Sequence, residues 1–161
     1  MEDVKLLKQI PLFKDFKVTE LMNVSMVADH VDVPAGEAVF KEKSKGDALF
    51  VIKRGRVRVT KRDSYGEEHV LAYFGPGEYF GEISLVDKAP RSASVYAEVN
   101  TELLKISRAD FKNLIAGDKE IERKFYKSFS EVLCERLRIA NENLTFSQEI
   151  NKMIQEVADG E

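Results

Sequence analysis

The sequence predicts a mainly β protein with flanking α-helices, and three observations support that prediction. Between residues 28 and 107, short apolar segments alternate with glycine and proline turns, which is typical of strands joined by tight connections. Before and after this stretch, apolar residues recur every three or four positions, as on one face of a helix. With 161 residues, 43% of them hydrophobic and 33% charged, the chain can form one globular domain with a real core. The strand-rich part is therefore expected to fold as a sandwich or a double-sheet roll.

The N-terminal part predicts two helices. Residues 2–10 place apolar side chains at helical spacing among lysines, and Pro11 ends that helix or forces a turn. A second helix is expected to be capped by Thr19, with Glu20 in its first turn. Its apolar side would consist of Leu21, Val24, Met26 and Val27. Both helices are expected to pack against the strands.

The strands of the central part are delimited by their own turns. Residues 55–61 (GRVRVTK) alternate strictly, which predicts a strand with Val57 and Val59 facing inward. Residues 64–66 (SYG) predict the tip of a hairpin, and residues 69–74 its returning strand. Two more strands are expected at residues 94–98 and 103–107.

From Arg108 onward the spacing is helical. A short helix over residues 110–116 is expected to stop at Gly117, since glycine favours the left-handed conformation that ends many helices. Asp118 can then cap a longer helix through its carboxylate. The apolar stripe of this helix comprises Ile121, Phe125, Phe129, Val132 and Leu133.

Beyond this stripe, a 4-3 spacing resembles a weak coiled-coil seam with polar residues at two positions. Its members are Leu133, Leu137, Ala140, Leu144, Ser147, Asn151 and Ile154. The seam predicts a homodimer through residues 118–158, and the alternative is that this segment folds back on its own strands. The polar trio 141–143 (NEN) is a candidate interruption of the helix.

Charge, cysteine content and hydropathy limit the class of protein. A net charge of −3 argues against a dedicated nucleic-acid-binding surface, which normally carries a basic excess. The single cysteine, Cys134, excludes an internal disulfide and a cysteine-based metal cluster, and its place in the helical pattern predicts a buried thiol. No segment is long and apolar enough for a signal peptide or a membrane span, so we expect a cytoplasmic protein without membrane contact.

Residues 78–95 combine the residue types that can surround a small anion. Gly81 allows the backbone to approach a ligand closely, and the residues after it can form one helical turn with free N–H groups. Arg91 can hold two phosphate oxygens through its planar guanidinium, while Glu82 suits a sugar hydroxyl better than a phosphate. From spacing alone, a surface salt bridge beside a turn is the alternative.

Residues 80–85 (FGEISL) and 90–94 (PRSAS) resemble the phosphate-binding cassette of the cyclic-nucleotide-binding domain family. That family includes the catabolite activator proteins and the regulatory subunits of cAMP-dependent protein kinase. The resemblance covers roughly residues 9–117, because further matching motifs are found at residues 9–13 (QIPLF), 34–36 (PAG) and 46–55 (GDALFVIKRG).

The resemblance implies an eight-stranded, jelly-roll-like β-roll with N-terminal helices over residues 1–117, and a C-terminal helical segment, 118–161, in the same domain. It assigns Arg91 to the equatorial phosphate oxygens and Glu82 to the ribose 2′-hydroxyl. The implied ligand site comprises Gly81, Glu82, Ile83, Ser84, Arg91, Ser92 and Ala93. Ser92 is compatible with either purine. Aromatic residues at helical spacing are more often core, and the candidates to cover the base are Phe125, Tyr126 and Phe129.

No catalytic or metal-binding motif is present in the sequence. Its two histidines, His30 and His69, are far apart, and no serine has the Gly-x-Ser-x-Gly context of an activated nucleophile. The resemblance therefore implies a sensor without enzyme activity or cofactor, which binds cAMP as first choice and cGMP as second. The sequence does not decide between these ligands and a cyclic dinucleotide.

The expected output is a signal through the C-terminal helices to a second subunit or a separate effector protein. Direct DNA binding is not expected, because about 20 residues follow Asn141, too few for a helix-turn-helix module. Two alternatives remain open at this point. One is an interaction module that binds no nucleotide, and the other is a regulatory subunit of an enzyme whose catalytic part lies on another chain.

Overall fold

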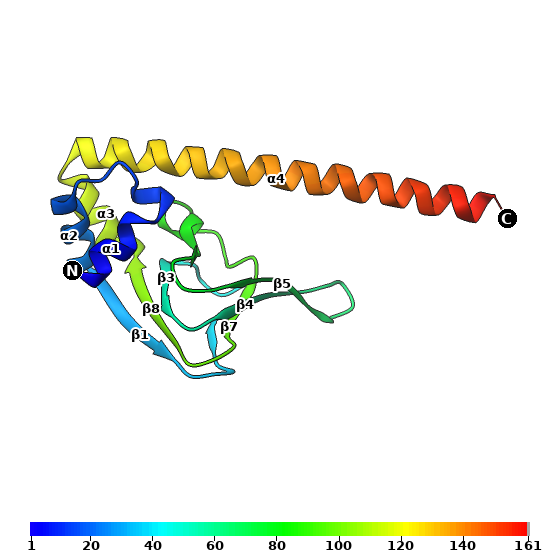
Figure 1. Ribbon diagram of the computed structural model, residues 1–161, viewed down its shortest axis with the longest axis horizontal. Helices are drawn as coiled ribbons and strands as arrows, with labels where there is room; N and C mark the ends of the chain where they lie inside the picture. The colour runs from blue at the N-terminus through cyan, green and yellow to red at the C-terminus, as the bar shows by residue number, and fades with distance from the viewer. Residues whose placement is uncertain (161) are drawn as a thin grey trace.

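The computed structural model describes residues 1–160, in which eight strands form two antiparallel four-stranded sheets (Figure 1). The predicted eight-stranded roll is therefore confirmed. One sheet has the order β1-β8-β3-β6, built from Ala28–Val33, Thr101–Ser107, Ala48–Arg54 and Tyr79–Phe80. The other has the order β2-β7-β4-β5, built from Ala38–Phe40, Ser94–Ala97, Val57–Arg62 and Glu68–Phe74.

Strand β3 separates two hydrophobic cores, which explains its unbroken apolar run. Its residues Ala48, Phe50 and Ile52 point into the roll between the two sheets. Leu49 and Val51 point the other way, into a cluster formed by the helices. All five side chains are buried, because both faces of this strand are covered.

The hairpin of β4 and β5 follows its predicted alternation and turn. Val57 is fully buried, and Val59 packs at the edge of the same core. The Asp63 carboxylate accepts hydrogen bonds from the backbone N–H groups of Tyr65 and Glu67, at 2.9 and 3.0 Å. Gly66 has φ of 85°, so the hairpin tip uses the conformational freedom of glycine.

At the N-terminus, α1 (Glu2–Lys8), the 3₁₀ helix η1 (Pro11–Phe13) and α2 (Val18–Met26) cover one side of the roll. The prediction that Thr19 caps α2 is wrong: the N-cap is Lys17, two residues earlier, and the Glu20 carboxylate accepts from the Lys17 N–H at 2.7 Å. Leu21 and Val24 are buried as expected. Met26 is 81% exposed, because it lies in the last turn, on the side facing solvent.

Two caps define the C-terminal helices. Helix α3 (Arg108–Ala116) begins after Ser107, whose hydroxyl accepts a hydrogen bond from the Asp110 N–H. Helix α4 (Lys119–Asp159) begins after Asp118, whose carboxylate accepts from the N–H groups of Glu120 and Ile121. Helix α3 ends at Ala116 with Gly117 as its C-cap, as predicted, although Gly117 has φ of −80° and not the expected left-handed conformation.

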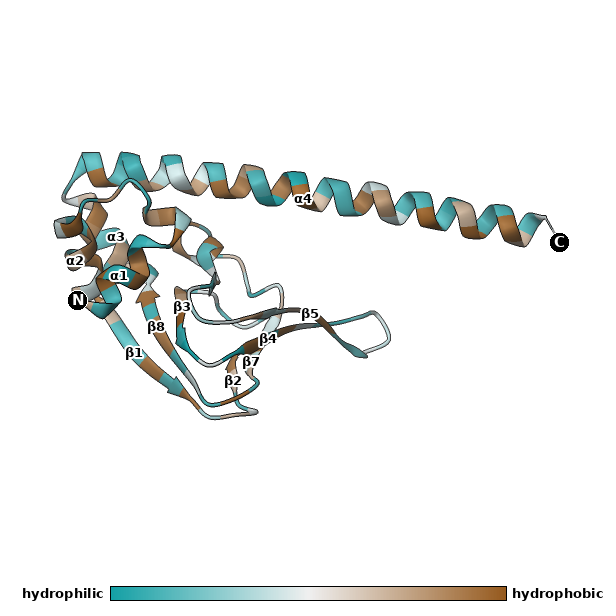
Figure 2. Ribbon diagram, viewed as in Figure 1, coloured by the Kyte–Doolittle hydropathy of each residue, from teal (hydrophilic) through white to brown (hydrophobic). Residues whose placement is uncertain are grey.

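Helix α4 runs 41 residues without a break, so residues 141–143 do not interrupt it. We call residues 119–132 the α4 base and residues 133–159 the α4 tip. The base buries Ile121, Phe125 and Phe129 against the helical core, whereas every residue of the tip is exposed. Figure 1 shows the tip extending beyond the roll, and Figure 2 shows apolar positions recurring along it.

The geometry of α4 corrects one prediction. Cys134 is exposed rather than buried, because it lies just beyond the point where the base leaves the core. Within residues 1–160, every helix falls short of the length or hydropathy that crossing a bilayer requires.

Candidate ligand-binding site

The candidate site lies where β6 leads into the short 3₁₀ helix η2 (Glu82–Leu85). Gly81 joins them with φ of 77°, a conformation that other residues resist. A Cβ atom at this position would lie 2.6 Å from Nη1 of Arg91 and 2.9 Å from the carbonyl oxygen of Ala48. Glycine is therefore required here both for backbone conformation and for the close approach of Arg91.

The hydrogen-bond partners of Arg91 are all neutral, although the nearby carboxylates of Asp47 and Glu82 favour its charged form. Its Nη1 donates to the Ser84 hydroxyl at 2.7 Å, and its Nη2 donates to the Ala48 carbonyl oxygen at 2.9 Å. The guanidinium carbon lies 4.0 Å from the centre of the Phe40 ring, and the residue is only 7% exposed. Burial lowers the pKa of Arg91, but an arginine in a protein keeps its charge. The buried Nε has no hydrogen-bond partner within residues 1–160. The site thus presents a desolvated positive charge whose N–H groups are not all used by the protein.

Glu82 lies beside this charge and is also buried, at 1% exposure. Its Oε1 is ion-paired with Nη1 of Arg136, which comes from the α4 tip. No hydrogen bond to its Oε2 is found in the described chain, so this oxygen can accept one from a ligand. Arg136 also lies over the ring of Tyr79, with its guanidinium carbon 5.7 Å from the ring centre.

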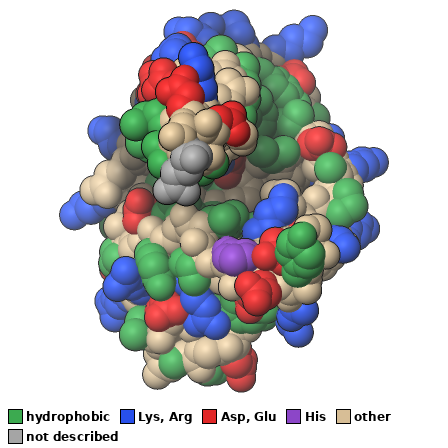
Figure 3. Space-filling view, turned by 90° about the vertical axis from the view of Figure 1, so that its right-hand side faces the viewer, with side chains coloured by type: hydrophobic (Ala, Val, Ile, Leu, Met, Phe, Trp, Pro, Cys, Tyr) green, Lys and Arg blue, Asp and Glu red, His purple; other side chains and the backbone are tan. Residues whose placement is uncertain are grey.

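These side chains line a cavity of about 280 Å³. Six of the seven predicted ligand residues border it: Gly81, Glu82, Ile83, Arg91, Ser92 and Ala93. The seventh, Ser84, lies behind Arg91 and orients it through the hydroxyl contact. The apolar wall comprises Phe40, Val59, Leu71, Phe74, Phe80 and Val95. Figure 3 shows the surface hollowed between α4 and the roll, with hydrophobic side chains on both sides.

The three aromatic residues expected to cover a base lie elsewhere. Phe125 and Phe129 are buried in the helical core, where the Phe125 ring packs edge-on against Phe111 with 4.7 Å between ring centres. Tyr126 is 39% exposed and contacts the Phe125 ring. None of the three lines the cavity, so the lid role predicted for them is not supported, because the α4 base packs against the helices rather than over the site.

Sequence reasoning missed two arginines at this site. Arg136 was not identified, although it continues the 4-3 spacing of Phe125, Phe129 and Val132 onto the cavity side of α4. Arg108 donates through Nη1 to the carbonyl oxygens of Gly46, Ser84 and Asp87, each at 3.0 Å. It therefore fixes η2 and the loop behind Arg91. No pattern in the sequence indicates this contact.

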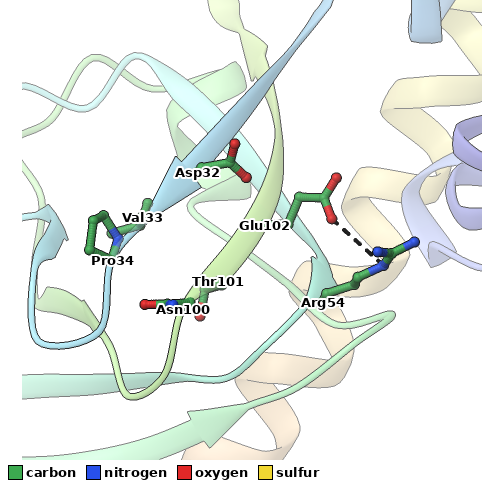
Figure 4. Close-up of a pocket in the computed structure, with 7 residues that line it drawn as sticks. All are labelled: Asp32, Val33, Pro34, Arg54, Asn100, Thr101 and Glu102. Carbon is green, nitrogen blue, oxygen red and sulfur yellow. Dashed lines mark ion pairs between the residues drawn. The ribbon is translucent and has the colours of Figure 1, made fainter.

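A larger cavity, about 480 Å³, lies at the β1–β2 and β7–β8 turns (Figure 4). It holds Asp32, Arg54, Asn100 and Glu102, and the Arg54 and Glu102 side chains are 3.7 Å apart. The Arg54 side chain is 73% exposed, so its charge is solvated. No buried charge faces this cavity, and the smaller cavity at Arg91 is the better candidate because of its chemistry.

A group of possible metal ligands occurs at the hairpin tip, in Asp63, Glu67 and His69. The His69 ring nitrogen Nε2 lies 2.7 Å from the Asp63 carboxylate, which lowers the pKa of Asp63, and all three residues are exposed. The same carboxylate accepts the backbone hydrogen bonds that form the turn. These contacts account for the cluster as part of the hairpin.

The chain belongs to the cyclic-nucleotide-binding domain family, whose model matches residues 30–118. A CRP-like cAMP-activated global transcriptional regulator of Mycobacterium tuberculosis is 30% identical over 140 residues, which is 87% of this chain and 61% of the relative. A cAMP-dependent protein kinase regulatory subunit of Emericella nidulans is 32% identical over 118 residues, 73% of this chain and 28% of the relative.

Among solved structures, the catabolite activator protein of Thermus thermophilus superposes with a TM-score of 0.76 at 34% identity. The match covers 85% of this chain and 62% of that one. The chain thus spans less than two thirds of these relatives. The predicted family resemblance is confirmed, and the fold is that of a cyclic-nucleotide-binding domain.

Proposed function

We propose that this protein is a regulatory sensor that binds a cyclic mononucleotide, cAMP first and cGMP second, in the cavity at Arg91. One observation supports this most strongly: a buried arginine with only neutral hydrogen-bond partners faces the same cavity as a buried carboxylate with one free oxygen. A cyclic phosphate on a ribose presents an anion and a hydroxyl, the two kinds of group that these side chains can bind. The names of the relatives point to the same ligand class.

In this proposal Arg91 holds the equatorial phosphate oxygens through its fork, and Ser92 and the backbone near Gly81, Ile83 and Ser84 add further donors. Glu82 accepts the ribose 2′-hydroxyl through Oε2 while Arg136 stays on Oε1. The base lies against the apolar wall of the cavity. Because a serine at position 92 suits either purine, the choice between cAMP and cGMP is left to measurement.

The signal would leave the site through Arg136, which joins the cavity to α4. A ligand hydroxyl that donates to Glu82 draws on the same carboxylate as Arg136 and so changes the strength of the Glu82–Arg136 pair. It shifts α4 only by its differential affinity for the two arrangements. The proposed action is binding alone, with no catalytic step and no cofactor. A reducing compartment such as the cytoplasm fits a chain with one exposed cysteine.

We infer a second copy of this chain as the first partner, bound through residues 118–158. The α4 tip supports this, because its large apolar side chains are all exposed on one long helix. A separate effector protein is the alternative, and the kinase regulatory relative favours a regulatory subunit of an enzyme on another chain. An interaction module without a ligand is disfavoured, because the cavity keeps both Arg91 and Glu82.

The test is calorimetric titration of the purified protein with cAMP, cGMP and cyclic di-GMP. We expect saturable binding of cAMP or cGMP. Arg91→Ala should lower that affinity by about 30- to 5000-fold, since losing one partner of a buried charge pair costs about 2–5 kcal/mol. Circular dichroism checks that the variant is folded. Affinity within threefold of the wild type would mean that the nucleotide binds elsewhere.

A second titration tests the role of Glu82 separately from that of Arg91. The ligand 2′-deoxy-cAMP should bind the wild type more weakly than cAMP does, while Glu82→Gln should discriminate much less between the two. The amide keeps the shape and one acceptor, so this variant should lose less affinity for cAMP than Arg91→Ala. Equal discrimination in both proteins would remove Glu82 from the ribose role.

A further inference from the structure

We propose that a cavity beside the β4–β5 hairpin is a second anion site, for a compact phosphate compound with several negative charges, such as a diphosphate. The cavity has a volume of about 320 Å³. Val95 and Ala97 of β7 point into the roll, so the alternate residues Ser94 and Tyr96, which line this cavity, face outward. The other lining residues come from the loop after β2 and from the end of β4: Lys41, Glu42, Lys43, Arg62 and Asp63.

The charges of this cavity favour an anion. Its three cations form no ion pair within residues 1–160, and they are Lys41, Lys43 and Arg62. The two acids are already used by the hairpin. Asp63 accepts from backbone N–H groups of the turn and lies 2.7 Å from Nε2 of His69. Glu42 accepts from the backbone N–H of Arg62 at 3.3 Å. The ammonium and guanidinium donors are therefore free for a ligand, and three of them together suit a multiply charged one.

Two hydroxyls add neutral donors to the same cavity. The Ser94 Oγ accepts from the N–H of Glu42 at 2.8 Å, and its own hydrogen has no acceptor in the described part of the chain. The Tyr96 hydroxyl makes no hydrogen bond there either. The Tyr96 ring is held by Arg58, whose guanidinium carbon lies 4.8 Å from the ring centre. Phosphate oxygens are strong acceptors, so a phosphate can use the cations and the hydroxyls together.

The backbone at Lys43 gives an independent reason to assign a role to its side chain. Lys43 has φ of 68°, and within residues 1–160 all other residues with positive φ are glycines. Its N–H donates to the Arg91 carbonyl oxygen at 2.8 Å, which holds this left-handed conformation in place. Glycine would adopt the same conformation without steric conflict, so the backbone gains nothing from a lysine here. The group with a use at this position is the ammonium.

The loop that carries Lys41 and Lys43 is hydrogen-bonded to the loop that carries Arg91. Besides the Lys43 contact, the N–H of Arg91 donates to the Ser44 carbonyl oxygen at 2.8 Å. An anion bound to Lys43 therefore acts on the backbone of the residue proposed to hold the cyclic phosphate. Binding at the two sites should be coupled, and the coupling must be reciprocal. The coupling rests on the proposed nucleotide function, whereas the anion site itself does not.

The test is an amide NMR titration of the full chain with sodium pyrophosphate, with ionic strength held constant by sodium chloride. We expect saturable shifts at Lys43, Arg62 and Ser94. Arg62→Gln should weaken binding about tenfold or more, the range of one charge-assisted hydrogen bond. Lys61→Gln is the matched control, because it removes the same charge from the adjacent residue of β4, which does not line the cavity. That variant should change the affinity by less than about twofold, since salt screens exposed charges that do not contact the ligand.

A second variant, Lys43→Gly, removes the ammonium and relaxes the backbone, so it should weaken pyrophosphate binding while the protein stays folded by circular dichroism. Equal affinities in Arg62→Gln and Lys61→Gln would overturn the proposal. So would binding that is lost in Arg91→Ala but kept in Arg62→Gln, because the probe would then occupy the nucleotide cavity.

Titrating cAMP with and without saturating pyrophosphate separates the two proposals. We expect pyrophosphate to change the affinity for cAMP in the wild type and not in Lys43→Gly. If pyrophosphate binds at Lys43 and Arg62 while cAMP does not bind at all, the anion site stands and the nucleotide function fails. If cAMP binds with the same affinity in both conditions, the coupling is wrong.

Discussion

The base and the tip of α4 belong to one continuous helix but differ completely in their surroundings. In the base, Phe125 and Phe129 are at most 6% exposed and pack against the helical core. In the tip, Phe146 is 64% exposed and Val157 is 70% exposed. The same helical geometry therefore places apolar residues inside a core at one end and in solvent at the other.

The two regions also share one hydrophobic pattern. A single 4-3 series runs through both, with Arg136 and Asn143 as its polar members: Phe125, Phe129, Val132, Arg136, Ile139, Asn143, Phe146, Ile150, Met153 and Val157. The base buries this stripe against the helical core, and the tip continues it with every residue from 133 to 159 exposed. Arg136 sits at the boundary and closes the ligand cavity. An apolar stripe that extends past its own core indicates an interface with another molecule.

The largest expected effect is on the free energy of unfolding, and it distinguishes the α4 base from the α4 tip. Phe125→Ala removes a buried ring and should destabilise the monomer by about 3–5 kcal/mol. Phe146→Ala removes the same atoms from an exposed position on the same series, and it should change stability by less than about 0.5 kcal/mol. Urea unfolding at low protein concentration measures both. Similar losses in the two variants would show that the tip is packed against its own chain in solution.

The next effect concerns association. Ile150→Glu would place a charge in the middle of a buried seam, and we expect it to weaken a dimer on the order of 100-fold or more. Leu137→Glu tests the other row, from Leu133 to Ile154, which the sequence predicted as the seam. Sedimentation equilibrium decides between the rows. If both variants associate as tightly as the wild type, α4 is not the dimer interface.

The sequence predicted the roll and the backbone turn at Gly81 well because both depend on local signals. Glycines at turns, alternation in β4 and the residues 80–94 determine backbone conformation and side-chain type over short distances. The missed contacts are long-range. Arg136 meets Glu82 across 54 positions, and Arg108 meets Gly46 across 62. Nothing in the local pattern specifies which surface arginine reaches a distant loop.

The aromatic residues of the α4 base also show that a local pattern does not specify long-range packing. Phe125, Tyr126 and Phe129 have the chemistry to stack on a purine, and their spacing places them on a helix near the site. Whether they face the ligand or the core depends on how α4 packs against η1 and α3. That packing follows from Phe13 and Phe111, which are far away in the sequence.

A smaller expected effect concerns Arg136 and the coupling between the cavity and α4. Arg136→Ala removes the side chain that joins the cavity to α4, so cAMP should no longer change the hydrogen exchange of residues 119–140. The expected loss is a coupling of about 1–3 kcal/mol, the usual scale for communication between sites. Arg138→Ala is the matched control, because Arg138 pairs with Glu135 on the helix surface only. If cAMP protects residues 119–140 equally in the wild type and in Arg136→Ala, the signal does not pass through this pair.

The smallest expected effect concerns the contact that ties the base to the residue after η1. Lys14 pairs with Glu131, and its ammonium lowers the pKa of the Glu131 carboxyl below the ordinary value. A carboxyl whose pKa is lowered on folding stabilises the protein above its unfolded-state pKa, and that stabilisation is lost as the pH falls through the folded-state pKa. Glu131→Gln should therefore lower Tm slightly at pH 7, and the difference from the wild type should shrink and disappear as the pH falls through the lowered folded-state pKa. High salt should reduce the difference at pH 7 as well, since both side chains are about half exposed. Glu135→Gln is the control in the tip, where the carboxylate pairs only within its own helix and should have no effect on Tm. A Tm difference for Glu131→Gln that does not shrink as the pH falls would mean that this residue acts through packing rather than through its charge.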